Sequence, residues 1–138
     1  MKNKPWLTFD CYDTLVRYTE SKTYTLKQLV QEKSDDVEKI EKARSVFEKT
    51  ERELQLGPFM VLSEIIYKSF MSAMQSVNLE ILPEDVEKII CSIKNADPFP
   101  DVFDALSALK DDYRLAILSN SQPGVIKYNI DKIGIEFD

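Results

Sequence analysis

Two short apolar segments of the chain each end abruptly in polar residues. The first, Trp6–Phe9, is followed by Asp10, and the second, residues 114–118, is followed by Ser119 and Asn120. Short apolar runs bounded by turn residues are typical of buried strands. In open α/β sheets, polar residues at the carboxyl ends of neighbouring strands form the active site. The pattern therefore predicts two strands with a site at their carboxyl edge.

Nearly all of the sequence between the two predicted strands has helical periodicity. Apolar residues recur every three or four positions, and charged residues occupy the other faces. Ser34-Asp35-Asp36 suits an amino-terminal cap, Gly57-Pro58 suits a helix end, and Pro83 suits a first helical turn. The predicted helices are 23–33, 37–54, 59–77, one that begins at residue 83, one over 102–109, and one after residue 124.

The block of predicted helices is too long to be a single crossover between two strands. We expect residues 18–96 to form an inserted helical lobe, and residues 1–17 and 97–138 to form a partial Rossmann-like core. Pro98 and Pro100 mark the return to this core. Two strands make too small a sheet to be stable alone, and Phe137-Asp138 resembles the approach to a third. The sequence therefore predicts a C-terminally truncated piece of a larger α/β protein.

Composition narrows the chemistry and the partners that we expect. The net charge of −6 argues against nucleic acid or an anionic membrane as a partner. The absence of histidine excludes Ser-His-Asp and Cys-His catalysis and histidine-ligated zinc. Two cysteines form no disulfide framework, so a reducing cytoplasm is the expected location. Any catalysis must use carboxylates, hydroxyls, amides, Lys or Arg.

The candidate catalytic residues follow the two predicted strands. Asp10, with Thr14 four residues later, suits nucleophilic catalysis, because the strand fixes the carboxylate and the turn surrounds it with N–H groups and a hydroxyl. Ser119 and Asn120 would add uncharged donors. The structural alternative is that Asp10 caps a turn while the other two residues end a strand. Spacing alone leaves both interpretations open.

The residues around Asp10 carry a family resemblance. Residues 7–15, Leu-Thr-Phe-Asp-Cys-Tyr-Asp-Thr-Leu, resemble the first motif of the haloacid dehalogenase-like (HAD) hydrolases, and most of all the L-2-haloacid dehalogenase pattern Asp-x-Tyr-Gly-Thr-Leu. Leu118-Ser119-Asn120 resembles the second motif of that superfamily, and residues 98–102 also resemble the dehalogenase branch. The resemblance implies an α/β fold, a HAD-like Rossmannoid parallel sheet with an inserted α-helical cap domain.

The resemblance also implies a mechanism. Asp10 would form a covalent aspartyl ester with a small acidic or phosphorylated substrate, and water would hydrolyse it. Thr14, Ser119 and Asn120 would hold the leaving group or a substrate oxygen. In a dehalogenase no cofactor is needed, whereas in a phosphatase Asp10 would bind Mg²⁺.

Three further side chains are candidate substrate contacts: Tyr12, Cys11 and Arg44. Strand alternation points Cys11 into the core, so an inert buried thiol is its alternative interpretation. Arg44 competes with Arg17 and Arg52 for the role of binding a substrate carboxylate. For each arginine, a place on a solvated helix face is the structural alternative.

Several functions stay open at this stage. Tyr12 stands where phosphatases of this superfamily have their acid–base aspartate, and because its unperturbed pKa is about 10 it favours the dehalogenase branch. Asp13 replaces the dehalogenase glycine, either as a turn aspartate or as a displaced acid. Lys127 and Lys132 do not match the third-motif lysine, which would follow Asp138 together with the acidic fourth motif. The alternatives are therefore a Mg²⁺-dependent phosphatase and an inactive fragment or binding module.

We expect a small-molecule substrate as the partner. An unpaired sheet edge also favours self-association into a homodimer.

Overall fold

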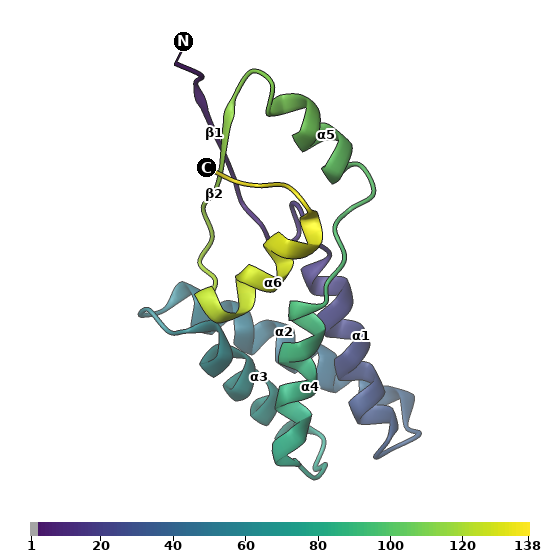
Figure 1. The fold of residues 1–138 in the computed structure, drawn as a ribbon. Helices are drawn as coiled ribbons and strands as arrows, with labels where there is room; N and C mark the ends of the chain where they lie inside the picture. The colour runs from purple at the N-terminus through teal and green to yellow at the C-terminus, as the bar shows by residue number, and fades with distance from the viewer. Residues whose placement is uncertain (1–2) are drawn as a thin grey trace. The chain divides into compact units, whose positions relative to one another are not determined.

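The computed structural model describes residues 3–138, which contain six helices and two strands (Figure 1). The chain divides into two compact units. The sheet unit contains the chain up to Ser21 and again from Ile93 to Asp138, and the helical unit is Lys22–Ser92. The predicted lobe, residues 18–96, extends beyond the helical unit at both ends, and its role as a cap stays a prediction. The elements are β1 (Trp6–Phe9), α1 (Tyr18–Gln31), α2 (Val37–Leu56), α3 (Leu62–Ser76), α4 (Pro83–Lys94), α5 (Val102–Leu109), β2 (Arg114–Ile117) and α6 (Pro123–Ile133).

The two strands of the sheet unit are parallel neighbours, so the predicted α/β class is confirmed. They pair in register from Trp6 opposite Arg114 to Phe9 opposite Ile117. The strand β2 ends at Ile117, one residue before the predicted end, although the Leu118 N–H still donates to the Phe9 carbonyl oxygen at 2.9 Å. The carboxyl ends of both strands therefore lie at the same edge of the sheet.

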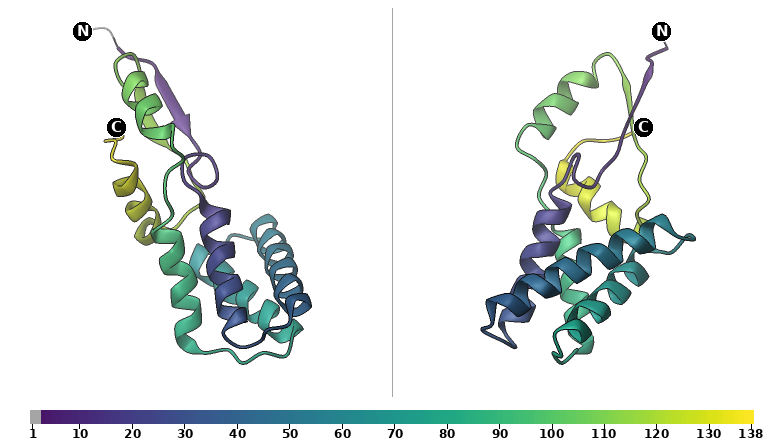
Figure 2. Two further views of the ribbon diagram at one scale, coloured as in Figure 1. Left: turned by 90° about the vertical axis from the view of Figure 1, so that its right-hand side faces the viewer. Right: turned by 180° about the vertical axis from the view of Figure 1, so that it is seen from behind.

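Helices α5 and α6 cover one face of this sheet (Figures 1 and 2). Alternate strand residues point to that face, where Leu115 is completely buried and Leu7 and Phe9 are partly buried. These side chains pack with apolar residues that include Leu106 of α5 and Ile133 of α6. The core of the sheet unit therefore lies between the sheet and these two helices.

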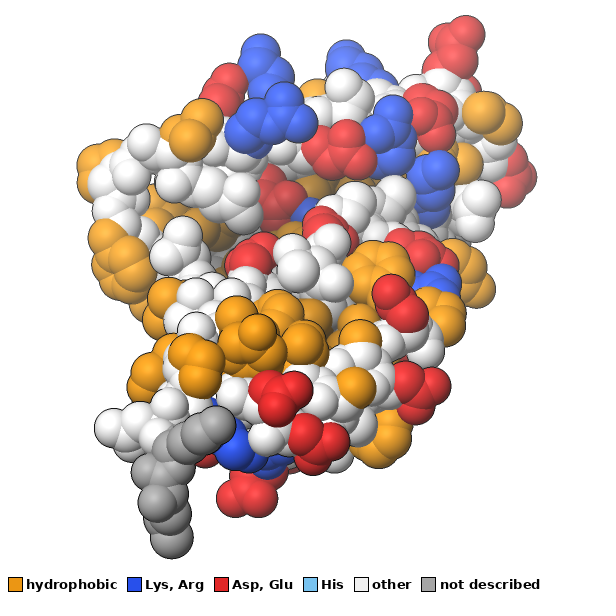
Figure 3. Space-filling view, turned by 90° about the horizontal axis from the view of Figure 1, so that it is seen from above, with side chains coloured by type: hydrophobic (Ala, Val, Ile, Leu, Met, Phe, Trp, Pro, Cys, Tyr) orange, Lys and Arg blue, Asp and Glu red, His pale blue; other side chains and the backbone are white. Residues whose placement is uncertain are grey.

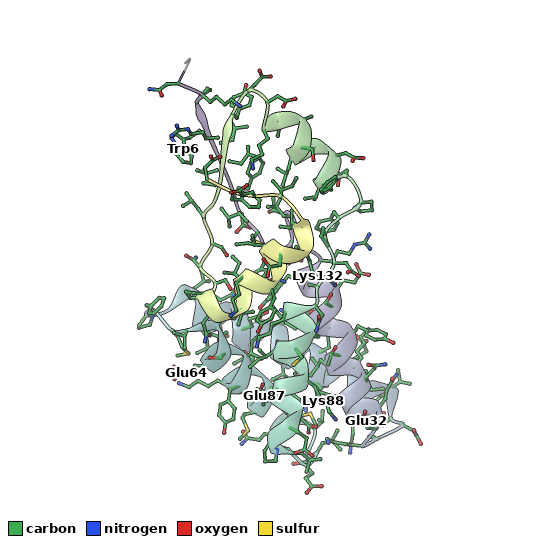
Figure 4. The ribbon with its side chains drawn as sticks, viewed as in Figure 1. Trp6, Glu32, Glu64, Glu87, Lys88 and Lys132 are labelled. Atoms are coloured by element: carbon green, nitrogen blue, oxygen red, sulfur yellow. The ribbon has the colours of Figure 1, made fainter. Side chains whose placement is uncertain are left out.

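The opposite face of the sheet carries exposed apolar side chains. Trp6 is 53% exposed and Leu118 is 66% exposed. Figure 4 shows Trp6 projecting from β1 on the side away from α5. The Arg114 guanidinium lies 5.4 Å from the centre of the Trp6 ring, which is a cation–π distance.

The last residues of the chain lie along the second edge of β2. The Asp138 N–H donates to the Leu115 carbonyl oxygen at 2.8 Å, and the Leu115 N–H donates to an Asp138 carboxylate oxygen at 3.0 Å. Because Leu118 bonds to Phe9 of β1 and successive strand residues face opposite edges, Leu115 faces away from β1. The approach of residues 137–138 to a third strand position, which the sequence predicts, is thus present.

The helical unit is built on an amphipathic helix pair. Helices α2 and α3 pack against each other (Figure 2), and Phe47 of α2 and Phe70 of α3 are completely buried. The cap predicted within residues 34–36 is present, and it is Asp36, whose Oδ1 accepts the Glu38 N–H at 2.9 Å. No helix within residues 3–138 combines the length and apolarity that a membrane span requires.

Some predicted helix bounds are wrong. Helix α1 begins at Tyr18 rather than at residue 23, because Asp13, in the turn before it, caps its first turn. Helix α3 begins at Leu62 rather than at residue 59, since Val61 has extended backbone (φ −68°, ψ 149°) and Phe59 is 89% exposed. Helix α2 ends at residue 56 rather than at residue 54.

Charged side chains of both signs mix on the surface. On the face shown in Figure 3, Lys and Arg side chains lie among Asp and Glu side chains rather than in one continuous basic area. The expectation that nucleic acid is not a partner stays a prediction.

Candidate active site

Asp10, Ser119 and Asn120 lie at the carboxyl edge of the sheet. Asp10 directly follows β1, and Ser119 comes two residues after β2. The last residues of the two strands, Phe9 and Ile117, lie opposite each other. Asp10 and Asn120 are exposed, and Ser119 is half-buried. The parallel pairing thus brings the predicted catalytic residues of the two strands to one edge.

Thr14 contacts Asp10 directly. Its Oγ1 donates a hydrogen bond to Asp10 Oδ2 at 3.2 Å. The turn between them is built on the Cys11 carbonyl oxygen, which accepts the N–H groups of Leu15 and Val16 at 2.8 and 3.2 Å. Leu15 and Val16 are buried in the core of the sheet unit, which anchors the turn. The turn therefore brings the Thr14 hydroxyl back to the carboxylate of Asp10, four residues earlier.

Asp13 is a structural residue of this turn. Its backbone is in the left-handed region (φ 60°), where glycine is usual and short polar residues are tolerated. Its Oδ1 accepts the Thr19 N–H at 2.9 Å, and its Oδ2 accepts the Thr19 hydroxyl at 2.6 Å. Because Thr19 lies in the first turn of α1, Asp13 caps this helix. The interpretation as a turn aspartate is confirmed, and both carboxylate oxygens are engaged.

Cys11 belongs to the core rather than to a binding surface. Its side chain is completely buried. Burial, with a smaller contribution from the Asp10 charge, raises the pKa of the Cys11 thiol to about 11, so the thiolate is scarce at neutral pH. The expected core placement is confirmed. The other expectation, a substrate contact through the Cys11 side chain, stays a prediction that the burial of this side chain does not favour.

The Tyr12 hydroxyl is engaged on the protein side. Tyr12 Oη lies 2.7 Å from Ser121 Oγ and donates to Asn129 Oδ1 at 3.1 Å. The Tyr12 ring stacks on the Tyr18 ring with 4.5 Å between ring centres. Burial is the main cause that raises the Tyr12 pKa to about 12. The phenol is therefore neutral near pH 7, and its expected substrate contact stays a prediction.

Arg44 is paired with carboxylates of its own helix. On α2, its Nη1 donates to Glu48 at 2.8 Å and its Nε donates to Glu41 at 3.0 Å. These hydrogen bonds raise the Arg44 pKa and lower the Glu41 pKa. Arg17 lies in the sheet unit, where its Nη1 is 3.5 Å from a Glu20 oxygen. The role of Arg44 in binding a substrate carboxylate stays a prediction.

Lys132 and Lys127 of α6 make contacts that do not involve Asp10. Lys132, labelled in Figure 4, donates to the Asn95 carbonyl oxygen and to Asp97 Oδ1, both at 2.7 Å. The bond to Lys132 lowers the Asp97 pKa. Lys127 lies 5.1 Å from the centre of the Tyr128 ring. These contacts agree with the expectation that neither lysine is the third-motif lysine.

A magnesium ion in the phosphatase branch would need oxygen ligands besides Asp10, since Mg²⁺ prefers an octahedral set. Within residues 3–138, no three Asp, Glu or Cys side chains lie close enough together to hold a metal ion. The Mg²⁺ expected for a phosphatase therefore stays a prediction.

The sequence interpretation missed two polar residues of the site, Ser121 and Asn129. Both hydrogen-bond to Tyr12. Asn129 is completely buried on α6 between the buried residues Val125 and Ile133. A polar residue at i+4 spacing within an apolar stripe was the available signal, because buried polar groups are normally hydrogen-bonded.

Comparison with known proteins identifies the fold. No family model and no curated protein matches the chain in sequence. An L-2-haloacid dehalogenase from Xanthobacter autotrophicus matches its structure with a TM-score of 0.75 and 17% identity, over 99% of this chain and 55% of that chain. A second structure of that enzyme has chloropropionic acid covalently bound. The L-2-haloacid dehalogenase PA0810 gives a TM-score of 0.73 and 22% identity, over 99% and 60% of the two chains. This chain has the haloacid dehalogenase-like fold.

A magnesium-bound structure shares this haloacid dehalogenase-like fold. The HAD-hydrolase YfnB from Bacillus subtilis, solved with magnesium, matches with a TM-score of 0.76 and 18% identity, over 96% of this chain and 61% of that chain. The HAD-like fold that the two motifs predict is thus confirmed. The chain spans 55% to 61% of the length of these three proteins.

Proposed function

We propose that the chain carries the nucleophile of a haloacid dehalogenase-like hydrolase, in which Asp10 attacks the halogen-bearing carbon of a small 2-haloacid. The observation that supports this most directly is the hydrogen bond from Thr14 Oγ1 to Asp10 Oδ2 at the carboxyl edge of the parallel sheet. A structural neighbour with covalently bound chloropropionic acid adds support by analogy.

The proposed reaction has two steps. First, an Asp10 carboxylate oxygen bonds to C2 of the 2-haloacid while the carbon–halogen bond breaks, and the halide leaves with the bonding electrons. Water then attacks the carbonyl carbon of the resulting ester, which regenerates the carboxylate and releases a 2-hydroxy acid and a proton. Thr14 holds one carboxylate oxygen so that the other is available for attack. Ser119 and Asn120 would donate to the halide or to a substrate oxygen.

The surroundings of Asp10 favour halide displacement over phosphate ester hydrolysis. An alkoxide leaving group needs a proton from a general acid, whereas a halide leaves without one. Tyr12 stands at the acid position, but its hydroxyl is engaged and its pKa is about 12. Asp13 has both oxygens bonded to Thr19. Neither residue is therefore suited to protonate a leaving group near neutral pH.

The test is to incubate the chain with L-2-chloropropionate and to follow chloride release and the intact mass of the protein. We expect chloride release and a propionate ester that peptide mapping places on Asp10. Asp10→Asn should abolish both signals. Asp13→Asn is the matched control, because asparagine also tolerates positive φ and keeps an acceptor for the Thr19 N–H.

Three other results would contradict the proposal. Chloride release that survives Asp10→Asn would exclude Asp10 as the nucleophile. Mg²⁺-dependent hydrolysis of phosphate esters without dehalogenation would favour the phosphatase alternative. A folded chain with neither activity nor an ester would indicate an inactive fragment or a binding module.

A further inference from the structure

Asn129 is a buried polar residue that the proposed chemistry does not use. It lies on α6, within the buried stripe of Val125 and Ile133, and it is completely buried. An amide group in such a place destabilises the fold unless it is hydrogen-bonded. Both polar atoms of the Asn129 side chain have partners, and these partners come from different segments of the sheet unit.

The directions of these hydrogen bonds follow from the chemistry of the groups. Asn129 Nδ2 lies 2.7 Å from the Ile93 carbonyl oxygen, which can only accept, so the amide donates there. Asn129 Oδ1 therefore faces the Tyr12 hydroxyl at 3.1 Å and accepts its single proton. Tyr12 Oη has no second proton for Ser121 Oγ at 2.7 Å. Ser121 must consequently donate to Tyr12.

The result is a directed chain of hydrogen bonds from Ser121 to Tyr12 to Asn129 to Ile93. Ser121 is two residues beyond Ser119, in the loop after β2, and Tyr12 is two residues beyond the candidate nucleophile, in the turn after β1. Ile93 is where the chain re-enters the sheet unit. The buried amide thus joins both catalytic loops to the returning segment.

We propose that Asn129 is a positioning residue of the candidate active site. By accepting a hydrogen bond from the Tyr12 hydroxyl, Asn129 holds the turn that carries Asp10 and Thr14 against the loop that carries Ser119. The Tyr12 pKa of about 12 agrees with a phenol whose proton is retained. The effect on chemistry rests on the proposed function, but the effect on the geometry of the turn does not.

The geometric effect is tested by amide hydrogen exchange of the whole chain, measured by NMR. The Asp13 and Leu15 N–H groups close the turn by donating to the Val16 and Cys11 carbonyl oxygens, and the Arg114 N–H, which donates to the Pro5 carbonyl oxygen at the other end of the strand pair, is the internal reference. In Asn129→Leu, and separately in Tyr12→Phe, we expect the two turn amides to exchange about tenfold faster relative to the reference. This factor corresponds to the loss of roughly one buried hydrogen bond.

A double variant and a control separate positioning from general destabilisation. Both substitutions remove the hydrogen bond between Tyr12 and Asn129, and each also removes one bond of its own, to Ser121 or to Ile93. The effects in Tyr12→Phe combined with Asn129→Leu should therefore fall well short of multiplying. Ile133→Val is the matched control on the same helix, since it loosens the core without touching the hydrogen bonds. It should change the turn and reference amides alike.

The proposal is overturned if the turn amides and the reference respond equally in Asn129→Leu, or if the two substitutions multiply. If Asn129→Leu does not fold, Tyr12→Phe, which removes a single oxygen, decides the question alone. Unchanged turn exchange in a folded Tyr12→Phe would then overturn it.

A second measurement links the geometry to chemistry. If the parent chain forms the Asp10 ester, the rate of ester formation should fall about tenfold in both single variants at an unchanged half-saturating substrate concentration. Ile133→Val should keep the parental rate. Unaltered rates in the two single variants would count against catalytic positioning. Absence of the ester in the parent would refute the proposed function, while the exchange data would still decide the role of Asn129.

Discussion

The Thr14 hydroxyl lies 3.2 Å from Asp10 Oδ2 and donates a hydrogen bond to it. A donor on one carboxylate oxygen restrains rotation of the carboxylate group, and in the proposed reaction it would leave the other oxygen available for attack. The same donor would lower the nucleophilicity of the bonded oxygen, so the two oxygens of Asp10 are not equivalent. This asymmetry makes Thr14 the first residue to test after Asp10.

Replacing Thr14 by valine keeps the shape of the side chain and removes the donor. We expect the rate of ester formation on Asp10 to fall by about tenfold to a hundredfold. Removing one hydrogen-bond donor that stabilises a transition state typically costs about a hundredfold or more, and a donor that only orients the carboxylate should cost less. Thr14→Ser, which keeps the hydroxyl, should retain most of the rate. Rapid mixing with L-2-chloropropionate, followed by intact-mass measurement, gives the rate. Equal rates in Thr14→Val and in the parent chain would show that the donor is not used.

Two weak acids beside the site, Cys11 and Tyr12, should make the fold sensitive to alkali. Burial raises the Cys11 pKa from 9.0 to about 11 and the Tyr12 pKa from 10.0 to about 12. The folded state therefore retains protons that the unfolded state has already lost. Stability is unaffected by these groups below pH 9, and it falls as the pH rises through the window from about 9 to about 12.

Urea unfolding at a series of pH values from about 8 to about 11 checks this sign. The midpoint concentration should fall with pH in the parent chain, and its slope should flatten in Cys11→Ala and in Tyr12→Phe. Slopes rather than absolute midpoints are compared, because both substitutions also disturb packing. Cys91→Ser is the control, since Cys91 is exposed. A parental slope in both test variants would contradict the assignment.

The sequence was most informative where structure and site are local. The apolar run before Asp10 and the turn to Thr14 lie within nine residues, so the strand, the turn and their hydrogen bond follow from short-range pattern. The fold followed from the same motif through its resemblance. Tyr12 and Asn129, in contrast, are separated by 117 positions, and only tertiary packing brings them together. The start of α1 was predicted too late for a different reason. The Asp13 cap lies in the preceding turn, and such a cap leaves no periodic signal in the sequence.

A buried ion pair in the helical unit offers a test of stability away from the site. Lys33 Nζ lies 3.1 Å from Asp85 Oδ2, and the Asp85 side chain is 1% exposed. Lys33→Met would leave a buried carboxylate without its cation, so we expect unfolding to become easier by about 3 kcal/mol. Lys49→Met is the matched control, because its pair with Glu53 is exposed, and it should stay within about 0.5 kcal/mol of the parent. Urea unfolding followed by circular dichroism measures both, and equal effects would show that burial does not strengthen the first pair.

Two glycines at opposite ends of α6, Gly124 and Gly134, should respond to replacement by alanine in opposite directions. Gly134 ends the helix in the left-handed region (φ 77°), and its N–H donates to the Ile130 carbonyl oxygen at 3.3 Å. A Cβ there would meet the Phe103 ring at an ordinary 3.6 Å, so the cost of Gly134→Ala is backbone strain, about 1 kcal/mol. Gly124 lies in the first turn, where an alanine methyl group would meet nothing within 4 Å, and Gly124→Ala should stabilise by a few tenths to about 1 kcal/mol. Thermal unfolding of the two variants at one pH decides the matter, since a gain in melting temperature for Gly134→Ala would refute the left-handed cap.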